Sequence, residues 1–220
     1  MVVGGGAGVQ VSRCIYHICH WKNLQSIVQC NGLLSDSQMR QQGGPPKNIG
    51  MSEVKSRRMN SPVDCYPGDV VGEYVPFYFC PRSIMLYILH RGNHPDLAYS
   101  GGQKPIVHLE ADLQQTVNWA NTQKLRWAFT LGNAASKFTP FFNDLKDLKH
   151  LNWKHIANTN FSDPEVKEHK WSEFLLHKGF SWQLVRRIGV YSNKVKGKVE
   201  KEIESATHKP PVVVVKDWYY

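Results

Sequence analysis

The sequence lacks the features that mark several common protein classes. It contains no run of about 18 apolar residues, so we expect no membrane-spanning helix. Its first residues lack the basic stretch and long apolar stretch of a signal peptide, and residues 1–13 are expected to form a flexible leader. The Walker loop and the Gly-x-Gly-x-x-Gly, Gly-x-Ser-x-Gly and His-Glu-x-x-His motifs are all missing, which argues against the enzyme classes that depend on them.

Cysteine is scarce and irregularly spaced. The 5 cysteines are an odd number and include no Cys-x-x-Cys pair, so the sequence predicts neither a disulfide framework nor a structural zinc site. Two of them, Cys14 and Cys19, lie near His17 and His20, but this spacing matches no common zinc pattern, and we expect no metal. A chain of this composition suits the reducing cytoplasm.

Acidic residues are outnumbered by basic ones. The chain has 18 Asp and Glu residues against 27 Lys and Arg residues, a formal net charge of +9. This balance indicates a polyanionic partner, and DNA, RNA, a nucleotide or an acidic membrane surface would all fit. The lysines between residues 194 and 201 are equally consistent with the solvated face of a helix.

What is present suffices for one folded domain. The chain has 220 residues, of which 41% are hydrophobic, so it can build a sizeable core, and we expect a single domain over residues 14–220. Strand-like and helix-like segments are mixed without regular βαβ alternation. The sequence therefore predicts the α+β class.

Residues 74–86 carry the densest pattern in the chain. Apolar residues alternate there with period 2, which predicts a strand. These alternating residues are Val75, Phe77 and Phe79. Because Pro76 cannot donate to a sheet ladder, the strand should be short or lie at an edge, and Ser83 can cap a following helix. The segment is either an aromatic core strand or a cradle for a ligand.

A polar segment, residues 35–60, is rich in Gln, Gly, Pro, Lys, Arg and Ser. Loops of this length inside a domain usually serve a function or are disordered, and we expect a long loop here. Arg58 closes it. Its planar guanidinium suits phosphate or carboxylate recognition, although most loop arginines are simply solvated.

Two further residues are candidates for chemistry. Glu173 is an acid inside the apolar, strand-like run 171–177, and burying a carboxylate is costly unless it is hydrogen-bonded or faces a site. The ordinary alternative is a salt bridge, for example with Arg58 or Lys170. His17 lies in a predicted first strand, where a satisfied core histidine is the usual case.

The order of several segments closely resembles the DarT family of DNA ADP-ribosyltransferase toxins. The resemblance spans roughly residues 14–220. The segments that carry it are Ile15-Tyr16-His17-Ile18-Cys19-His20-Trp21, Val54-Lys55-Ser56-Arg57-Arg58, Tyr74-Val75-Pro76-Phe77-Tyr78-Phe79-Cys80-Pro81-Arg82-Ser83, Tyr99-Ser100-Gly101-Gly102-Gln103, Trp171-Ser172-Glu173-Phe174-Leu175 and Lys216-Asp217-Trp218-Tyr219-Tyr220.

This resemblance implies an ADP-ribosyltransferase fold, with a central split β-sheet flanked by helices and a cleft for NAD⁺. The enzyme would transfer ADP-ribose to a base of single-stranded DNA, thymine in a short sequence context or alternatively guanine, and release nicotinamide. It would act as the toxin of a toxin–antitoxin or anti-phage system, with a DarG-like macrodomain antitoxin that removes ADP-ribose. We expect a monomer.

Residue roles follow from the same resemblance. Arg58 and Glu173 would be the catalytic residues, and residues 35–58 would form a lid over NAD⁺. Asn133 would belong to the loop that presents the DNA acceptor. The residues expected to bind NAD⁺ besides Arg58 are His17, Ile18, Cys19, Ser26, Leu34, Tyr78 and Met85.

One segment departs from the family pattern. Thymine-modifying members carry Phe-Thr-Asp-x-His where this chain has Leu131 and Asn133 in place of the aspartate and the histidine. An asparagine can donate and accept hydrogen bonds but cannot shuttle a proton near neutral pH. RNA or protein therefore stays open as the acceptor, and a basic nucleic-acid-binding module without enzymatic activity is a further alternative.

Overall fold

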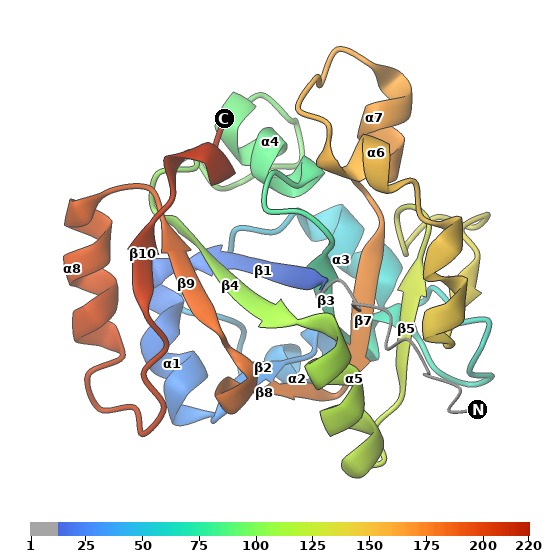
Figure 1. The fold of residues 1–220 in the computed structure, drawn as a ribbon, viewed down its shortest axis with the longest axis horizontal. Coiled ribbons are helices and arrows are strands. Elements are labelled where there is room, and N and C mark those ends of the chain that lie inside the picture. The colour runs from blue at the N-terminus through green and yellow to red at the C-terminus, as the bar shows by residue number, and fades with distance from the viewer. Residues whose placement is uncertain (1–12) are drawn as a thin grey trace, which may run out of the picture.

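A computed structural model describes residues 13–220. The expected leader lies outside these residues except for Arg13, whose carbonyl accepts a hydrogen bond from the Leu113 amide. The fold is built on an 8-stranded sheet and a small 2-stranded sheet (Figure 1). In spatial order, the large sheet contains β10 (Val212–Val214), β9 (Arg187–Val190), β4 (Ile106–Asp112), β1 (Cys14–His20), β3 (Tyr74–Tyr78), β7 (Glu173–His177), β5 (Trp127–Thr130) and β6 (Phe141–Phe142).

The remaining elements surround this sheet. The small sheet pairs β2 (Gly32–Leu34) with β8 (Gly179–Ser181). The α-helices of the described residues are α1 (Leu24–Gln29), α2 (Asp36–Gln41), α3 (Ser52–Arg58), α4 (Ile84–Arg91), α5 (Leu113–Thr122), α6 (Trp153–Ala157), α7 (Pro164–His169) and α8 (Asn193–Glu202). Short 3-10 helices lie at Trp21–Asn23, Val71–Glu73, Leu145–His150, Trp182–Leu184 and Lys216–Trp218. Within the described part of the chain, no helix is long and apolar enough to cross a membrane.

The predicted α+β class and the split sheet are confirmed. All strand pairs of the large sheet are antiparallel except that of β9 and β10. β1 pairs with β4 along its whole length but meets β3 at a single register position, Tyr16 opposite Tyr78. The sheet is therefore open between β1 and β3.

Pro76 explains how a proline fits into an interior strand. β3 is short, with 5 residues, but it lies between β1 and β7 rather than at an edge. The Pro76 carbonyl accepts a hydrogen bond from the His17 side chain at 2.9 Å, and the missing Pro76 N–H falls on this same side of the strand, where the ladder is already open. The proline therefore breaks no additional sheet bond.

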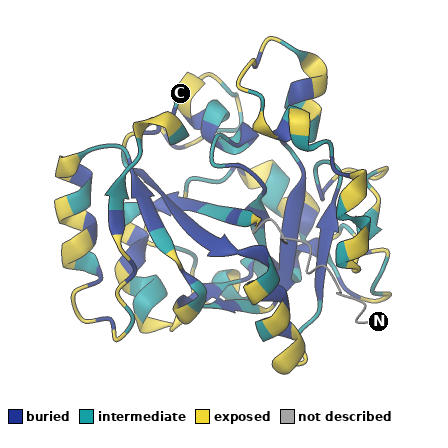
Figure 2. Cartoon of the chain, viewed as in Figure 1, coloured by how far each residue is buried: buried dark blue, intermediate teal, exposed yellow. Residues whose placement is uncertain are grey.

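The core lies on both faces of the sheet, and the helices expose their outer sides (Figure 2). Val75 and Phe77 are fully buried, and the Phe77 ring packs against Phe174 and Phe180. In contrast, Pro76 and Tyr78 are only half-buried. One face of β3 therefore belongs to the core, and the opposite face, with Pro76 and Tyr78, is available to a ligand.

The prediction of a long loop over residues 35–60 is wrong in part. Two helices, α2 and α3, lie there, with an irregular stretch between them. The Ser35 hydroxyl caps α2 by accepting the Gln38 amide. Helices of 6 and 7 residues with mostly polar faces give no periodic apolar stripe, so sequence patterning could not show them.

The C-terminal residues close one side of the fold. The Tyr219 hydroxyl donates to the Ile106 carbonyl at 2.7 Å, and the Tyr220 hydroxyl donates to the Arg82 carbonyl at 2.8 Å. The Trp218 ring lies over Gly189 in β9, where a Cβ atom would come within 2.4 Å of it. Glycine is therefore required at this position.

We predict opposite effects for alanine at two glycines. Gly189→Ala should lower the free energy of unfolding by about 1–3 kcal/mol, because the methyl group overlaps Trp218. Gly197→Ala, at an exposed position of α8 with nothing within 4 Å of its Cβ, should raise it by about 0.5–1 kcal/mol through helix propensity. Urea denaturation of both variants measures this. A Gly189→Ala protein as stable as the parent would contradict the packing argument.

Candidate active site

A cavity of about 390 Å³ lies over the opening between β1 and β3. Its walls come from β1, α1, β3 and α4, from the segment containing α2 and α3, and from the start of β7 with the loop after β5. Every residue that the sequence predicts for the site lines this cavity. These residues are His17, Ile18, Cys19, Ser26, Leu34, Arg58, Tyr78, Met85, Asn133 and Glu173.

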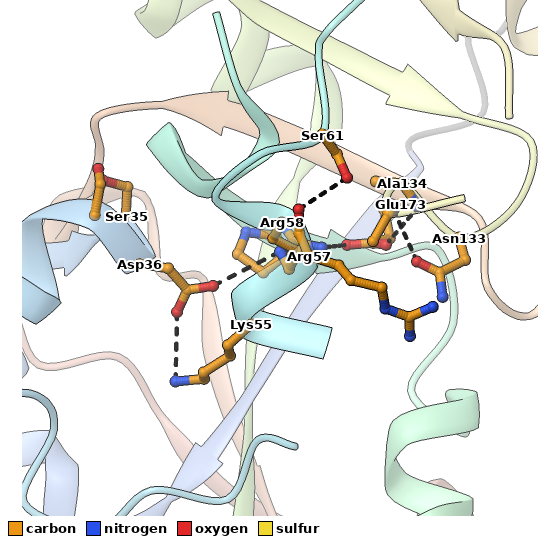
Figure 3. A network of polar contacts seen from close by, with 12 residues as sticks. Ser35, Asp36, Lys55, Arg57, Arg58, Ser61, Asn133, Ala134 and Glu173 are labelled. Atoms are coloured by element: carbon orange, nitrogen blue, oxygen red, sulfur yellow. Dashed lines mark hydrogen bonds and ion pairs between the residues drawn. The ribbon is translucent and has the colours of Figure 1, made fainter. Parts of the chain in front are cut away.

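A buried ion pair occupies the cavity wall (Figure 3). Arg58 Nη1 donates to Glu173 Oε2 at 2.8 Å, and the two residues are only 5% and 3% exposed. The other carboxylate oxygen, Glu173 Oε1, accepts the Ala134 amide at 3.1 Å. Glu173 therefore forms the salt bridge with Arg58 and also lines the cavity.

The Arg58 guanidinium has capacity left for a ligand. Among the described residues, neither Nε nor Nη2 has a hydrogen-bond partner, although both atoms are buried. An unsatisfied buried donor costs about 1–3 kcal/mol. Burial by itself would lower the pKa of Arg58, but the carboxylates of Glu173 and Asp36 raise it above its ordinary value, so the group stays a cation. A phosphate or carbonyl oxygen would satisfy it.

Asp36 is a site residue that sequence reasoning missed. Its carboxylate lies 3.6 Å from Arg58 Nε and 3.4 Å from Lys55 Nζ, so it connects α2 to α3. A second missed residue, Asn23, donates to the Lys47 carbonyl and accepts the Lys47 amide, which fixes the stretch between the two helices. Sequence patterns did not single out Asp36 or Asn23, because their partners are distant in the sequence.

His17 presents one free nitrogen to the cavity. Since the Pro76 carbonyl can only accept, the His17 Nδ1–H donates to it, and Nε2 is left as an acceptor. Desolvation lowers the pKa of His17 below its usual 6.5, despite the opposing hydrogen bond to Pro76. The imidazole is therefore neutral at physiological pH and suits a hydroxyl or amide donor.

Tyr78 and Met85 shape the same wall from the strand and the helix that follows it. Tyr78 lies directly opposite Glu173 in the β3–β7 register. Burial raises the pKa of Tyr78, so its ring remains a neutral phenol. Met85 lies in the first turn of α4, which the Ser83 hydroxyl caps as predicted. An aromatic face beside a thioether suits a planar ring.

Four more predicted residues contribute apolar or already bonded surface. Ile18 is buried, and Leu34 ends β2 at the cavity wall. Burial raises the pKa of the Cys19 thiol to about 12, which keeps it protonated. The Ser26 hydroxyl donates to the Asn23 carbonyl at 2.8 Å. These groups define the shape of the cavity rather than its charge.

Asn133 opens the loop after β5. Its side-chain oxygen accepts the Ala135 amide at 2.9 Å, and its carbonyl accepts the Ser136 amide and the Thr139 hydroxyl. Within residues 13–220, its side-chain nitrogen has no hydrogen-bond partner. The cavity is thus bordered by a fixed amide donor.

Comparison with known proteins agrees with this geometry. The family model described as "ssDNA thymidine ADP-ribosyltransferase, DarT" matches residues 16–220. The chain belongs to the DarT family. It is 38% identical over 211 residues to a DNA ADP-ribosyl transferase of Thermus sp. (strain 2.9), which covers 94% of this chain and 95% of the relative. A DNA ADP-ribosyl transferase of Thermus aquaticus is 36% identical over 219 residues, covering 98% and 92%.

Solved DarT structures share the fold. Thermus sp. 2.9 DarT in complex with ADP-ribosylated ssDNA superposes with a TM-score of 0.84 at 37% identity, covering 95% of this chain and 97% of that one. The same protein in complex with NAD⁺ gives a TM-score of 0.81 at 36% identity, covering 97% and 100%. The predicted family and fold are therefore confirmed, whereas the roles of individual residues in this DarT-family chain stay predictions.

We predict that the Arg58–Glu173 pair is strongly coupled in stability. Arg58→Ala leaves a buried carboxylate without its cation and should cost about 3–5 kcal/mol. In the Arg58→Ala/Glu173→Ala double variant, the loss should be clearly smaller than the sum of the two single losses, because no charge is stranded. Urea unfolding of the four proteins measures the coupling. Additivity within about 0.5 kcal/mol would contradict the buried pair.

The pH dependence of His17 gives a second prediction. Unfolded His17 binds a proton near pH 6.5, whereas the folded protein resists it until a lower pH. Its contribution to stability is therefore complete above pH 6.5 and is lost as the pH falls through the folded pKa. A ¹⁵N NMR titration should show neutral His17 at pH 6.5, with the urea-unfolded protein as control. Protonation at or above pH 6.5 would contradict the lowered pKa and the neutral imidazole.

Proposed function

We propose that this protein uses NAD⁺ to ADP-ribosylate a thymine base of single-stranded DNA, with Arg58 and Glu173 as the catalytic residues. As a member of the DarT family, the chain is an NAD⁺-dependent DNA ADP-ribosyltransferase. The observation that supports the residue roles is the buried Arg58–Glu173 pair on the cavity wall, with one guanidinium nitrogen, Nη2, left to bind a ligand.

Glu173 supplies negative charge where the reaction develops positive charge. Cleavage of the bond between nicotinamide and the ribose C1′ leaves oxocarbenium character on the sugar, and nicotinamide departs with the electron pair. A fixed carboxylate in a cavity shielded from water stabilises that charge without reorganisation. Its position is already set by Arg58 and the Ala134 amide.

The other NAD⁺ contacts follow from the free atoms of the site. Arg58 Nη2 can donate to a pyrophosphate oxygen, and the Tyr78 ring can stack on nicotinamide. His17 Nε2 can accept a hydrogen bond from a ribose hydroxyl or the carboxamide. Ile18, Cys19, Leu34 and Met85 exclude water around these polar contacts.

Proton removal from the attacking base nitrogen falls to Glu173 in this proposal. The raised pKa of Arg58 keeps the guanidinium protonated, so it orients and stabilises rather than accepting a proton. The new bond joins the base nitrogen to C1′, and the proton released from that nitrogen passes to the carboxylate.

Asn133 supports recognition of the base. Its side-chain nitrogen can donate to a thymine carbonyl oxygen, but guanine also offers acceptors, so the amide alone does not distinguish these bases. Thymine is proposed because the matching family model describes thymidine as the acceptor. We further propose a toxin role in the cytoplasm with a macrodomain partner that removes ADP-ribose, on the resemblance to the toxin family.

We predict that Glu173→Gln lowers transfer to single-stranded DNA by at least about 100-fold, because the amide keeps the volume of the side chain but not its charge. Glu200→Gln is the matched control, since Glu200 is exposed on α8, where it forms an ion pair with Lys196. Purified protein, NAD⁺ and oligonucleotides rich in each base are analysed on denaturing gels.

The modified base is identified by mass spectrometry of the digested nucleosides. ADP-ribosylated thymidine supports the proposal, and a guanosine adduct would correct the base. Unchanged DNA beside labelled RNA or protein would overturn the DNA acceptor. DNA binding without any transfer of ADP-ribose would instead support a basic nucleic-acid-binding module without enzymatic activity.

A further inference from the structure

We propose that Arg57 and Phe138 form an acceptor rim that binds the nucleotide next to the acceptor base, through its phosphate and its base respectively. This inference rests on the proposed single-stranded DNA acceptor and adds residues outside the cavity lining. The rim flanks Asn133, with Arg57 contributed by α3 and Phe138 by the loop after β5.

Phe138 is the first observation. Its side chain is 93% exposed, the only large hydrophobic side chain among residues 13–220 that is exposed to this extent. Single exposed apolar residues are common on protein surfaces, so the significance of Phe138 lies in its position next to the cavity. Phe138 lies in the loop that starts at Asn133, on the cavity border, and the exposed Lys137 precedes it.

The loop holds Phe138 near the site. The Thr139 hydroxyl donates to the Asn133 carbonyl at 2.8 Å, so the residue that follows Phe138 contacts the cavity-lining residue directly. The Ala134 amide of the same loop binds Glu173. Since adjacent Cα atoms are about 3.8 Å apart, the backbone of Phe138 lies next to Thr139 and therefore close to Asn133. A loop closed in this way presents the ring without much loss of entropy on binding.

Arg57 is the second, independent observation. It precedes Arg58 on α3, so their side chains leave the helix in different directions, and Arg57 is exposed whereas Arg58 is buried. Figure 3 shows the Arg57 side chain extending away from the ion pair on the side where Asn133 lies. Within the described residues its guanidinium has no hydrogen bond or ion pair. A free cation is thus available beside the cavity.

The charge and chemistry of the rim match one strand of nucleic acid. Residues 131–142 contain no Asp or Glu, and Lys137 adds a second cation to the rim. Proteins bind single strands by combining cations that follow the phosphates with aromatic rings on which bases stack. An extended peptide would gain little from a lone exposed ring and guanidinium without an apolar groove.

The test compares acceptor variants in the intact enzyme. Phe138→Ala should lower kcat/KM for a single-stranded oligonucleotide about 10-fold, and Phe138→Trp should restore it, because base stacking on an aromatic ring is lost and regained. Arg57→Ala should make the slope of log kcat/KM against log salt concentration shallower by about 0.7, the value for one phosphate contact on a single strand. Lys201→Ala, exposed on α8 at the far end of the sheet, is the charge-matched control (Figure 1).

An oligonucleotide with abasic sites on both sides of the acceptor base makes the test specific. With this substrate, Phe138→Ala should cause less than a 2-fold further loss, because the stacking partner is already missing. The rim would be overturned if Phe138→Ala and Arg57→Ala both kept the kcat/KM of the parent enzyme. It would also be overturned if calorimetry showed that their affinity for NAD⁺ had fallen by the same factor as kcat/KM. If the parent enzyme modifies no single-stranded DNA, the proposed function itself fails and the rim falls with it.

Discussion

The ion pair between Arg58 and Glu173 joins helix α3 to the paired strands β5 and β7 of the large sheet. Arg58 comes from the end of α3, Glu173 begins β7, and the Ala134 amide that completes the carboxylate contact belongs to the loop after β5. Two buried charges are stable only with matched partners, so each contact restricts where the others can lie. Arg58 Nη2, which has no hydrogen-bond partner among the described residues, is therefore held at a fixed position in the cavity wall.

The opening of the sheet creates the space that this pair faces. A continuous ladder between β1 and β3 would place backbone where the cavity lies, but the two strands meet only at Tyr16 and Tyr78. Pro76 has no N–H that could complete the ladder, and its carbonyl accepts a hydrogen bond from the His17 ring instead of from β1 backbone. This hydrogen bond places the proton of the neutral His17 ring on Nδ1, so Nε2 is an acceptor. One proline thus links the backbone pattern to the chemistry of the site.

Sequence patterning could identify part of this arrangement. Alternation located β3 and the buried Val75 and Phe77, and Glu173 stood out as an acid inside an apolar strand. Residue roles came from family resemblance, because periodicity cannot pair Arg58 with a carboxylate 115 residues away. The helices α2 and α3, and with them Asp36, escaped because short polar helices depend on tertiary contacts rather than on an apolar stripe.

Asn133 links the loop after β5 to the carboxylate of Glu173. The asparagine uses its own oxygen to hold the loop that carries Ala134, so it stabilises the contact to Glu173 as well as bordering the cavity. A histidine could offer a proton at this position, whereas an amide can only donate a fixed hydrogen bond. With Arg58 kept cationic by its neighbours, the groups of this cavity that can accept a proton are the carboxylates of Glu173 and Asp36 and the Nε2 atom of His17. In the proposed reaction the Glu173 carboxylate, which Arg58 and the Ala134 amide hold in place, both stabilises the sugar and takes up the proton, so the acceptor chemistry depends on the geometry of the ion pair.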